Sequence, residues 1–328
     1  MLGDLDLKRI KDGLGNLEVP LEIIFHPDQQ DSDLSKELLK TAKQIEQAAA
    51  GSVTVKHGSG EGLPARPGLS LAYRGKSNIH YLAIPEGPEV IPFIEACLDL
   101  PKGAVGHDQA WAQTLAGLNQ PAQVYVFMAT TCPNCPKAVQ AAIKISQISH
   151  QIESFIIDAQ RYQELAKLYK AQSVPLTVID QGFSKIGVMP PASLAEIILG
   201  RDHVQYQGQV FTSLVETSRL EDAAKLVVEK GAVGFVGAWN KSTTSSRMGL
   251  LLVVENVLGQ SADAFNEIIS ELVAATKSED AALRGDTADL LGQIGHADCV
   301  AILKTLLDDP NPDVAEIAQD GLDEISAG

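Results

Sequence analysis

The sequence has few cysteines, few aromatic residues and no long apolar run. Four cysteines occur among 328 residues, and Phe, Trp and Tyr together make up 5%. No stretch approaches the roughly 20 apolar residues of a membrane-spanning helix, and the charged segment Met1–Ile10 lacks the apolar core of a signal peptide. We therefore expect a cytoplasmic protein, in which a close cysteine pair is catalytic or metal-binding and not a structural crosslink.

Basic residues are also scarce, and the acidic excess is uneven. The formal net charge is -16; residues 201–328 carry 21 acidic side chains against 9 basic ones, whereas residues 1–200 carry 21 against 17. Nucleic acid and anionic lipid need clustered positive charge, so we expect neither nucleic acid nor a membrane as a partner. The apolar fraction of 45% is that of a globular protein, and the length suits two or three domains.

Two of the four cysteines, Cys132 and Cys135, are two residues apart and follow the apolar run Val124–Met128. The pattern predicts a strand, a short turn and a helix, with Pro133 at the first helical position, where its missing N–H costs nothing. A helix N-terminus stabilises a thiolate, and the short gap lets the second sulfur reach the first. Dithiol–disulfide exchange is therefore the favoured interpretation. An inert crosslink, or half of a zinc site whose other ligands lack the spacing, are the alternatives.

The first 200 residues contain two similar series of predicted elements. The first comprises strands 19–25, 52–56, 68–73 and 78–83 with helices 33–49 and 86–98. The second comprises strands 124–128, 154–158, 176–180 and 184–188 with helices from 132, over 161–170 and over 192–199. In each series a proline, Pro67 or Pro175, precedes the penultimate strand; a strand entrance tolerates proline, and both positions are candidates for a cis peptide bond. The pattern indicates an internal repeat of an α/β unit.

Beyond Arg201 the pattern is helical throughout. Helices are predicted over 220–230, 246–258, 262–276, 280–294, 297–308 and 313–325. Similar segments begin at Met248, Leu283 and Val314, at offsets of 35 and 31 residues. Paired helices at this period predict an all-α solenoid.

The motif Thr131–Ala141, together with Val174-Pro175 and Arg66-Pro67, resembles two families. One is the N-terminal domain of the alkyl hydroperoxide reductase flavoprotein subunit, and the other is the glutaredoxin-like protein disulfide oxidoreductases of archaea. Both fuse two thioredoxin folds. The helical part resembles HEAT-type repeats. The resemblance implies tandem α/β thioredoxin folds followed by an all-α HEAT-like solenoid, with domains at 1–103, 104–202 and 203–328.

The same resemblance implies a thiol–disulfide oxidoreductase that reduces protein disulfides. Cys132 would be the exposed nucleophile and Cys135 the buried resolving thiol, with Pro133, Asn134, Val174 and Pro175 in support. The resemblance also implies a separate flavoprotein or thioredoxin-reductase-like electron donor and a peroxiredoxin-like acceptor. No cofactor or metal is expected besides the redox-active disulfide; the glycine-rich segment Gly231–Gly237 lacks the spacing of a dinucleotide fingerprint.

Several residues depart from this pattern. Phe25–Asp31 stands where a first cysteine pair would be, so the first half is expected to be redox-silent and a candidate docking surface. Val126 stands where thioredoxin has its buried acid, which predicts that this proton acceptor is missing. His26 and Asp28 are expected to be solvated, whereas the isolated cysteines, Cys97 and Cys299, are expected to fill cores. An alternative function is a redox-sensing or redox-inert scaffold that binds a protein partner through the helical repeats.

Overall fold

The computed structural model describes all residues except 1, 18, 103–109, 181, 202–203 and 328. The chain divides into two compact units, Met1–Leu199 and Gly200–Gly328. The finer boundaries predicted at 103/104 and 202/203 lie outside the described residues. Among the helices in the described part of the chain, none is both long and apolar enough to cross a membrane.

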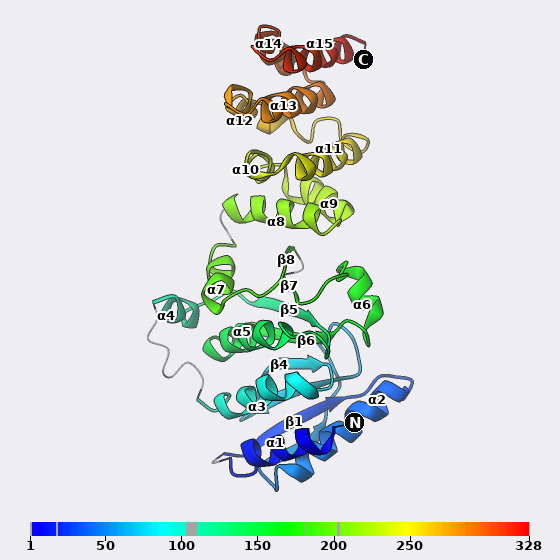
Figure 1. Ribbon diagram of the computed structural model, residues 1–328, viewed down its shortest axis with the longest axis vertical. Coiled ribbons are helices and arrows are strands. Elements are labelled where there is room, and N and C mark those ends of the chain that lie inside the picture. Colours follow the sequence, from blue (N-terminus) through cyan, green and yellow to red (C-terminus); the bar gives the residue numbers. More distant parts are fainter. Residues whose placement is uncertain (1, 18, 103–109, 181, 202–203, 328) are drawn as a thin grey trace. The chain divides into compact units, whose positions relative to one another are not determined.

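The first unit is built on one eight-stranded sheet, in the order β2-β1-β3-β4-β6-β5-β7-β8 (Figure 1). Its strands are β1 Leu21–His26, β2 Val53–His57, β3 Gly68–Tyr73, β4 Lys76–Leu82, β5 Ala122–Met128, β6 Ile152–Asp158, β7 Leu176–Ile179 and β8 Phe183–Ile186. In each half the first and second strands are parallel, and the third is antiparallel to the first and to the fourth. The halves join where β4 pairs in parallel with β6.

Helices cover both faces of this sheet. They are α1 Asp4–Leu14, α2 Asp33–Ala48, the 3-10 turn η1 Gly87–Glu89, α3 Val90–Asp99, α4 Ala110–Ala116, α5 Cys135–Ile148, α6 Gln163–Leu168 and α7 Pro191–Leu199. Successive side chains of a strand point to opposite faces. Ser154 of β6 bonds Ser146 of α5 at 2.5 Å, whereas its neighbour Phe155 packs in one apolar cluster with Leu165 of α6. The faces under α5 and α6 are therefore opposite.

The two halves are also tied by side chains. The Asn78 amide of β4 donates to the carbonyl oxygens of Ser146 and Ile152, at 2.7 and 2.9 Å. These acceptors lie near the end of α5 and at the start of β6, both in the second half. Because α5 begins at Cys135, a residue of the first half helps to hold the helix that carries the cysteine motif.

The second unit is all-helical. Its elements are α8 Val204–Glu216, α9 Leu220–Lys230, α10 Phe235–Lys241, α11 Thr244–Leu258, η2 Asn266–Ile268, α12 Ile269–Leu272, η3 Ala275–Lys277, α13 Ala281–Ile294, α14 Ala297–Leu306 and α15 Pro312–Ala327. Two of these, α8 and α10, were not predicted. The single helix predicted over 262–276 is wrong: the segment breaks into α12 between two 3-10 turns. Asn266 bonds Asp263 at 3.0 Å, and such local side-chain bonds compete with helix.

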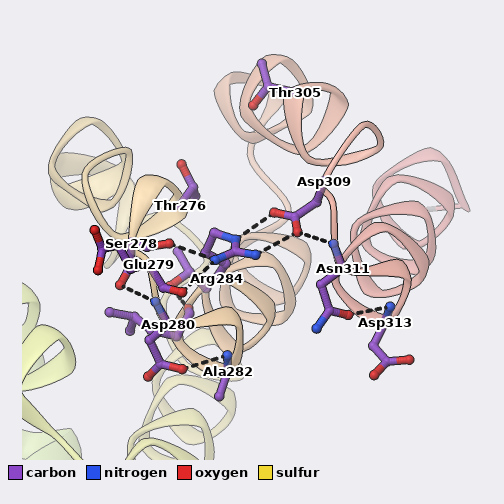
Figure 2. Close-up of polar contacts among 12 residues, drawn as sticks. Thr276, Ser278, Glu279, Asp280, Ala282, Arg284, Thr305, Asp309, Asn311 and Asp313 are labelled. Atoms are coloured by element: carbon purple, nitrogen blue, oxygen red, sulfur yellow. Dashed lines mark hydrogen bonds and ion pairs between the residues drawn. The ribbon is translucent and has the colours of Figure 1, made fainter.

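An arginine near the start of two of the long helices binds a carboxylate further along the chain. The Arg284 guanidinium of α13 donates to both oxygens of Asp309, at 2.7 and 2.8 Å, and to the Ser278 carbonyl (Figure 2). In α11, Arg247 binds Asp286 at 2.5 Å and the Ser242 carbonyl at 2.7 Å. Arg284 also holds the pKa of Asp309 below its usual value. This recurring contact links α11 to α13 and α13 to the turn before α15.

We expect Gly292→Ala to destabilise the helical unit. A Cβ on Gly292 of α13 would lie 2.8 Å from the Gly321 Cα of α15, a backbone atom that cannot move aside. Overpacking of this kind costs about 1–3 kcal/mol. Gly285→Ala on the same helix is the matched control, because its Cβ would meet side-chain atoms alone, Ile317 Cδ1 at 3.3 Å and Val314 Cγ2 at 3.7 Å, and helix propensity favours alanine by about 1 kcal/mol.

Thermal unfolding followed by Trp239 fluorescence in a Trp111→Phe background tests this prediction. Trp239 is fully buried in the helical unit, so its emission reports that unit. The midpoint should fall by several degrees for Gly292→Ala and stay or rise for Gly285→Ala. Equal midpoints for the two variants would contradict close backbone packing of α13 on α15.

Candidate active site

The cysteine motif lies at the carboxyl end of β5. The chain leaves β5 at Met128 and turns, with the Cys132 N–H donating to the Ala129 carbonyl at 3.0 Å. Cys132 and Cys135 are joined by a disulfide, with their Cα atoms 5.5 Å apart. Cys132 is partly exposed, whereas Cys135 is completely buried. The two sulfurs therefore differ in access as the sequence predicts.

The start of the active-site helix differs from the prediction. Helix α5 begins at Cys135, with Asn134 at the N-cap position, and Pro136 lies in its first turn. Pro133 precedes the helix and is exposed, so its prediction as the first helical residue is wrong. Both Pro133 and Pro136 are suited to the start of a helix. Because the chain is still in the turn at Cys132, the helix begins later and Pro136 lies in its first turn. Cys132 is still next to the helix N-terminus, where a negative charge is stabilised.

The loop before β7 faces the cysteines. The Val174–Pro175 peptide bond is cis, and the Cys132 Sγ lies 3.7 Å from the Val174 carbonyl oxygen. Pro175 is buried and Val174 is partly exposed. The other candidate, Arg66–Pro67 in the first half, is also cis. The structure thus brings Val174 to Cys132, across 42 residues of sequence, whereas the Asn134 side chain is exposed and makes no cap bond.

Two apolar residues beside Pro175 are not distinguished by the sequence pattern. Ile186 and Val188 are 53% and 42% exposed. They flank Gly187, whose N–H donates to the Pro175 carbonyl at 2.8 Å. This bond keeps the exposed pair next to the proline loop that faces Cys132. In the sequence they belong to an ordinary strand pattern, which does not reveal which apolar residues remain exposed.

A buried carboxyl, Glu89, is also missed by sequence reasoning. Its side chain is 1% exposed, and neither oxygen has a hydrogen-bond partner among the described residues. Burial raises the pKa of Glu89 to about 7. Glu89 belongs to η1, which packs against α5, the helix that begins with Cys135. Nothing in the local sequence signals this burial, because an acid at a helix start is ordinary.

The predictions for His26, Cys97 and Cys299 have different outcomes. His26 is not solvated as predicted: it bonds Ser70 at 2.8 Å, and Ser70 bonds His80 at 2.7 Å. Burial, followed by the charge on His80, lowers the pKa of His26. Cys97 and Cys299 are buried free thiols, as predicted. No group of three or more potential metal ligands occurs among the residues that the structure describes.

With this geometry in view, the comparisons with known proteins identify the second half of the sheet. A family model described as a thioredoxin domain matches residues 122–199. Residues 122–199 have a thioredoxin-like fold. The thioredoxin domain contains β5, α5 and the Cys132–Cys135 disulfide at the end of that strand. The strand, turn and helix predicted around the cysteine pair are confirmed.

Two curated relatives match a longer stretch than the family model does. The F subunit of alkyl hydroperoxide reductase of Pseudomonas aeruginosa is 27% identical over 175 residues, 52% of this chain and 32% of the relative. The corresponding protein of Staphylococcus epidermidis is 28% identical over 149 residues, 45% of this chain and 28% of the relative. The chain thus spans about a third or less of the length of these relatives.

Solved structures show the same fold. The F subunit of the alkylhydroperoxide reductase of Enterococcus faecalis (V583) has a TM-score of 0.51 at 22% identity, covering 60% of this chain and 98% of that chain. A protein disulfide oxidoreductase of Aeropyrum pernix K1 has a TM-score of 0.53 at 18% identity, covering 61% and 94%. The thioredoxin-fold region therefore resembles both families named from the sequence motifs.

Proposed function

We propose that the chain is a thiol–disulfide oxidoreductase that reduces protein disulfides through Cys132 and Cys135. One observation carries the proposal: within a thioredoxin domain, a partly exposed sulfur and a completely buried one are joined in a disulfide beside the Val174 carbonyl. An inert crosslink would have no need of an exposed sulfur or of a neighbouring open loop. The redox group is the disulfide itself, and no bound cofactor or metal takes part.

In the proposed reaction the dithiol form is the reductant. The Cys132 thiolate attacks one sulfur of a substrate disulfide, forming a mixed disulfide and releasing the first substrate thiolate. Cys135 then loses its proton and attacks the Cys132 sulfur, which releases the second substrate thiolate and forms the Cys132–Cys135 disulfide. Two electrons pass to the substrate. An external dithiol or reductase must return two electrons before the next turnover.

Other residues support these steps. The Val174 backbone, Pro175 and the exposed Ile186 and Val188 line the approach to Cys132 and bind an extended apolar substrate segment. Glu89 accepts the Cys135 proton, because its buried carboxyl has a pKa of about 7 and its 3-10 turn packs against α5. A buried base with a pKa near ambient pH is suited to this transfer. Pro133 and Asn134 shape the turn between the sulfurs.

The proposed domains are two fused thioredoxin-like folds, 1–103 and 104–202, and a HEAT-like repeat domain, 203–328. The identical order of strand pairing in the two halves of the sheet supports the first part. The recurring contacts of Arg247 and Arg284 support the second. The first half contains no cysteine pair and would be redox-silent.

The proposed partners follow from the relatives, which are subunits of a peroxide reductase. A separate flavoprotein or thioredoxin-reductase-like protein would supply electrons, and a peroxiredoxin-like protein would accept them in a cytoplasmic, reducing setting. A second function, a scaffold that binds a protein partner, is supported by Met248 and Leu252. These residues lie one turn apart on α11 and are 64% and 54% exposed.

A single-turnover experiment separates the two functions. The full chain is reduced, freed of reductant and mixed with excess insulin, whose disulfides serve as the model substrate. An oxidoreductase should transfer two electrons per chain and lose two hydrogens at the Cys132–Cys135 pair, as read by mass spectrometry of its peptides. A pair that stays reduced while Cys132 is accessible to an alkylating reagent would rule out the proposed reaction and leave the scaffold.

A further inference from the structure

A groove beside Pro67 in the first half has no role in the proposed disulfide exchange at Cys132 and Cys135. It encloses about 580 Å³ and is formed by both halves of the sheet unit. We call it the Pro67 groove. Its lining includes Ser32, Leu34, Arg66, Pro67, Leu165 and Leu168. Its floor is fixed, because the Tyr162 hydroxyl donates to the Pro67 carbonyl at 2.6 Å. Leu168 on its rim is 65% exposed.

The cysteine cleft lies between the start of α5 and the cis-proline loop before β7, and the Pro67 groove lies at the corresponding place in the first half. Ser32 caps α2, which follows β1 as α5 follows β5. Arg66 precedes a cis proline at the entrance of β3, as Val174 does at the entrance of β7. The first half therefore retains the open loop and the proline wall of the cleft while it lacks the two sulfurs. A cleft of this form can still bind an extended chain.

One cation in the groove is available to an incoming acid. The Arg66 guanidinium is exposed and donates to a neutral group, the Ser59 carbonyl, at 2.9 Å. Two other charges in the groove are compensated, because Arg161 contacts Glu37, Glu86 and Asp158 and Glu164 pairs with Lys167, whereas Asp28 accepts the Ser32 N–H at the start of α2. An acidic side chain is the complement of Arg66, and apolar side chains are the complement of Leu34 and Leu168.

The groove and the cysteine cleft are within reach of one extended segment. Both prolines lie at strand entrances, and β3 and β7 are four steps apart in the sheet order. At about 4.8 Å per step the two entrances are about 19 Å apart, which about six extended residues can span. Leu34 near the groove and Val174 near the cysteines pack against the same apolar cluster.

We propose that the Pro67 groove binds the disulfide substrate itself, through an extended segment that carries apolar side chains and one acidic side chain about six residues from the reactive cysteine. The cysteine-free half thus supplies specificity, and the other half supplies chemistry. The inference rests on the proposed oxidoreductase function. It predicts that the groove affects substrates long enough to reach it and has no effect on small disulfides.

The test uses the full, prereduced chain and synthetic peptides whose single cysteine carries a nitrothiobenzoate leaving group. One peptide has a Leu-Glu-Leu segment six residues from the cysteine, a second has it directly adjacent, and a third replaces Glu by Lys. The rate of nitrothiobenzoate release gives the second-order rate constant for the single reaction of each reduced chain with the peptide. The variants are Arg66→Glu and Leu168→Ser, with Arg74→Glu as the control, since Arg74 lies in the turn after β3 and does not line the groove.

Arg66→Glu and Leu168→Ser should each lower this second-order rate constant for the peptide with Glu six residues from the cysteine by about tenfold. The Lys peptide should react faster with Arg66→Glu than with the unmodified chain. Dithiobis-nitrobenzoate should react equally with all forms. Unchanged peptide rates in both variants, or an equal loss on the small disulfide, would overturn the groove assignment. Failure of the unmodified chain to reduce the small disulfide would instead overturn the oxidoreductase function.

Discussion

Replacing Cys132 by serine should lower the rate of disulfide reduction by about three orders of magnitude or more. Cys132 is the partly exposed sulfur, and Cys135 has no exposed surface from which to attack a protein. A serine hydroxyl is not ionised near neutral pH and does not exchange with disulfides. The rate is measured with the full chain, insulin as substrate and dithiothreitol as electron source, after subtraction of the uncatalysed reaction.

Cys135→Ser should behave differently from Cys132→Ser. The first attack still occurs, but no thiol remains to release the substrate, so a mixed disulfide at Cys132 should accumulate. Non-reducing electrophoresis and peptide mass spectrometry detect this adduct. Cys299→Ala, which removes a buried thiol in the helical unit, is the control and should retain full activity. Turnover that survives Cys132→Ser, or an adduct on Cys135 in the unmodified chain, would reverse or remove the assigned roles.

The cysteine motif was predictable because its chemistry is local. Two residues of spacing, an apolar run before Cys132 and a helical pattern after it determine the strand, the turn and the helix. The proline loop at Val174 was predictable from the resemblance, although only the fold shows that the Val174 carbonyl approaches the Cys132 sulfur. The start of α5 was misplaced by three residues, because Pro133 and Pro136 both suit a helix start.

Residues whose surroundings depend on contacts with distant segments, or on competing local bonds, were not predictable. Glu89 is an ordinary helix-start acid in sequence, and it is buried where η1 packs against α3 and against α5 of the other half. His26 looks like a solvated loop residue, yet β1 and β3 place it against Ser70. The helical pattern of 262–276 was correct in period, but local bonds of the kind made by Asn266 interrupt the helix. Each wrong or missing prediction involves a contact between segments far apart in the chain, or a side-chain bond that competes with the helix and leaves the apolar periodicity unchanged.

Glu89→Gln should slow the step in which Cys135 breaks the mixed disulfide and releases the substrate thiol. The expected loss is about a hundredfold, within the usual contribution of a general base. Glutamine keeps the size and polarity of the side chain but cannot take the Cys135 proton. Stopped-flow release of a second thiol from a preformed mixed disulfide at Cys132 measures this step. The rate in the unmodified chain should rise with pH around 7, where Glu89 ionises, and the variant should lack that rise. Glu95→Gln, an exposed change on α3, should leave the profile intact.

The same carboxyl has a stability consequence of predictable sign. The folded state raises the pKa of Glu89 from 4.5 to about 7, so it binds a proton more tightly than the unfolded chain. Stability from this group is therefore greatest below pH 4.5 and declines as the pH rises to about 7 and above, by about 3 kcal/mol in total. Glutamine stays neutral and has no such loss. In urea unfolding of the disulfide form, the free energy of unfolding of Glu89→Gln should therefore rise relative to that of the unmodified chain between pH 5 and pH 8.5. Parallel pH profiles for the two proteins would show that Glu89 is ionised freely and cannot be the buried base.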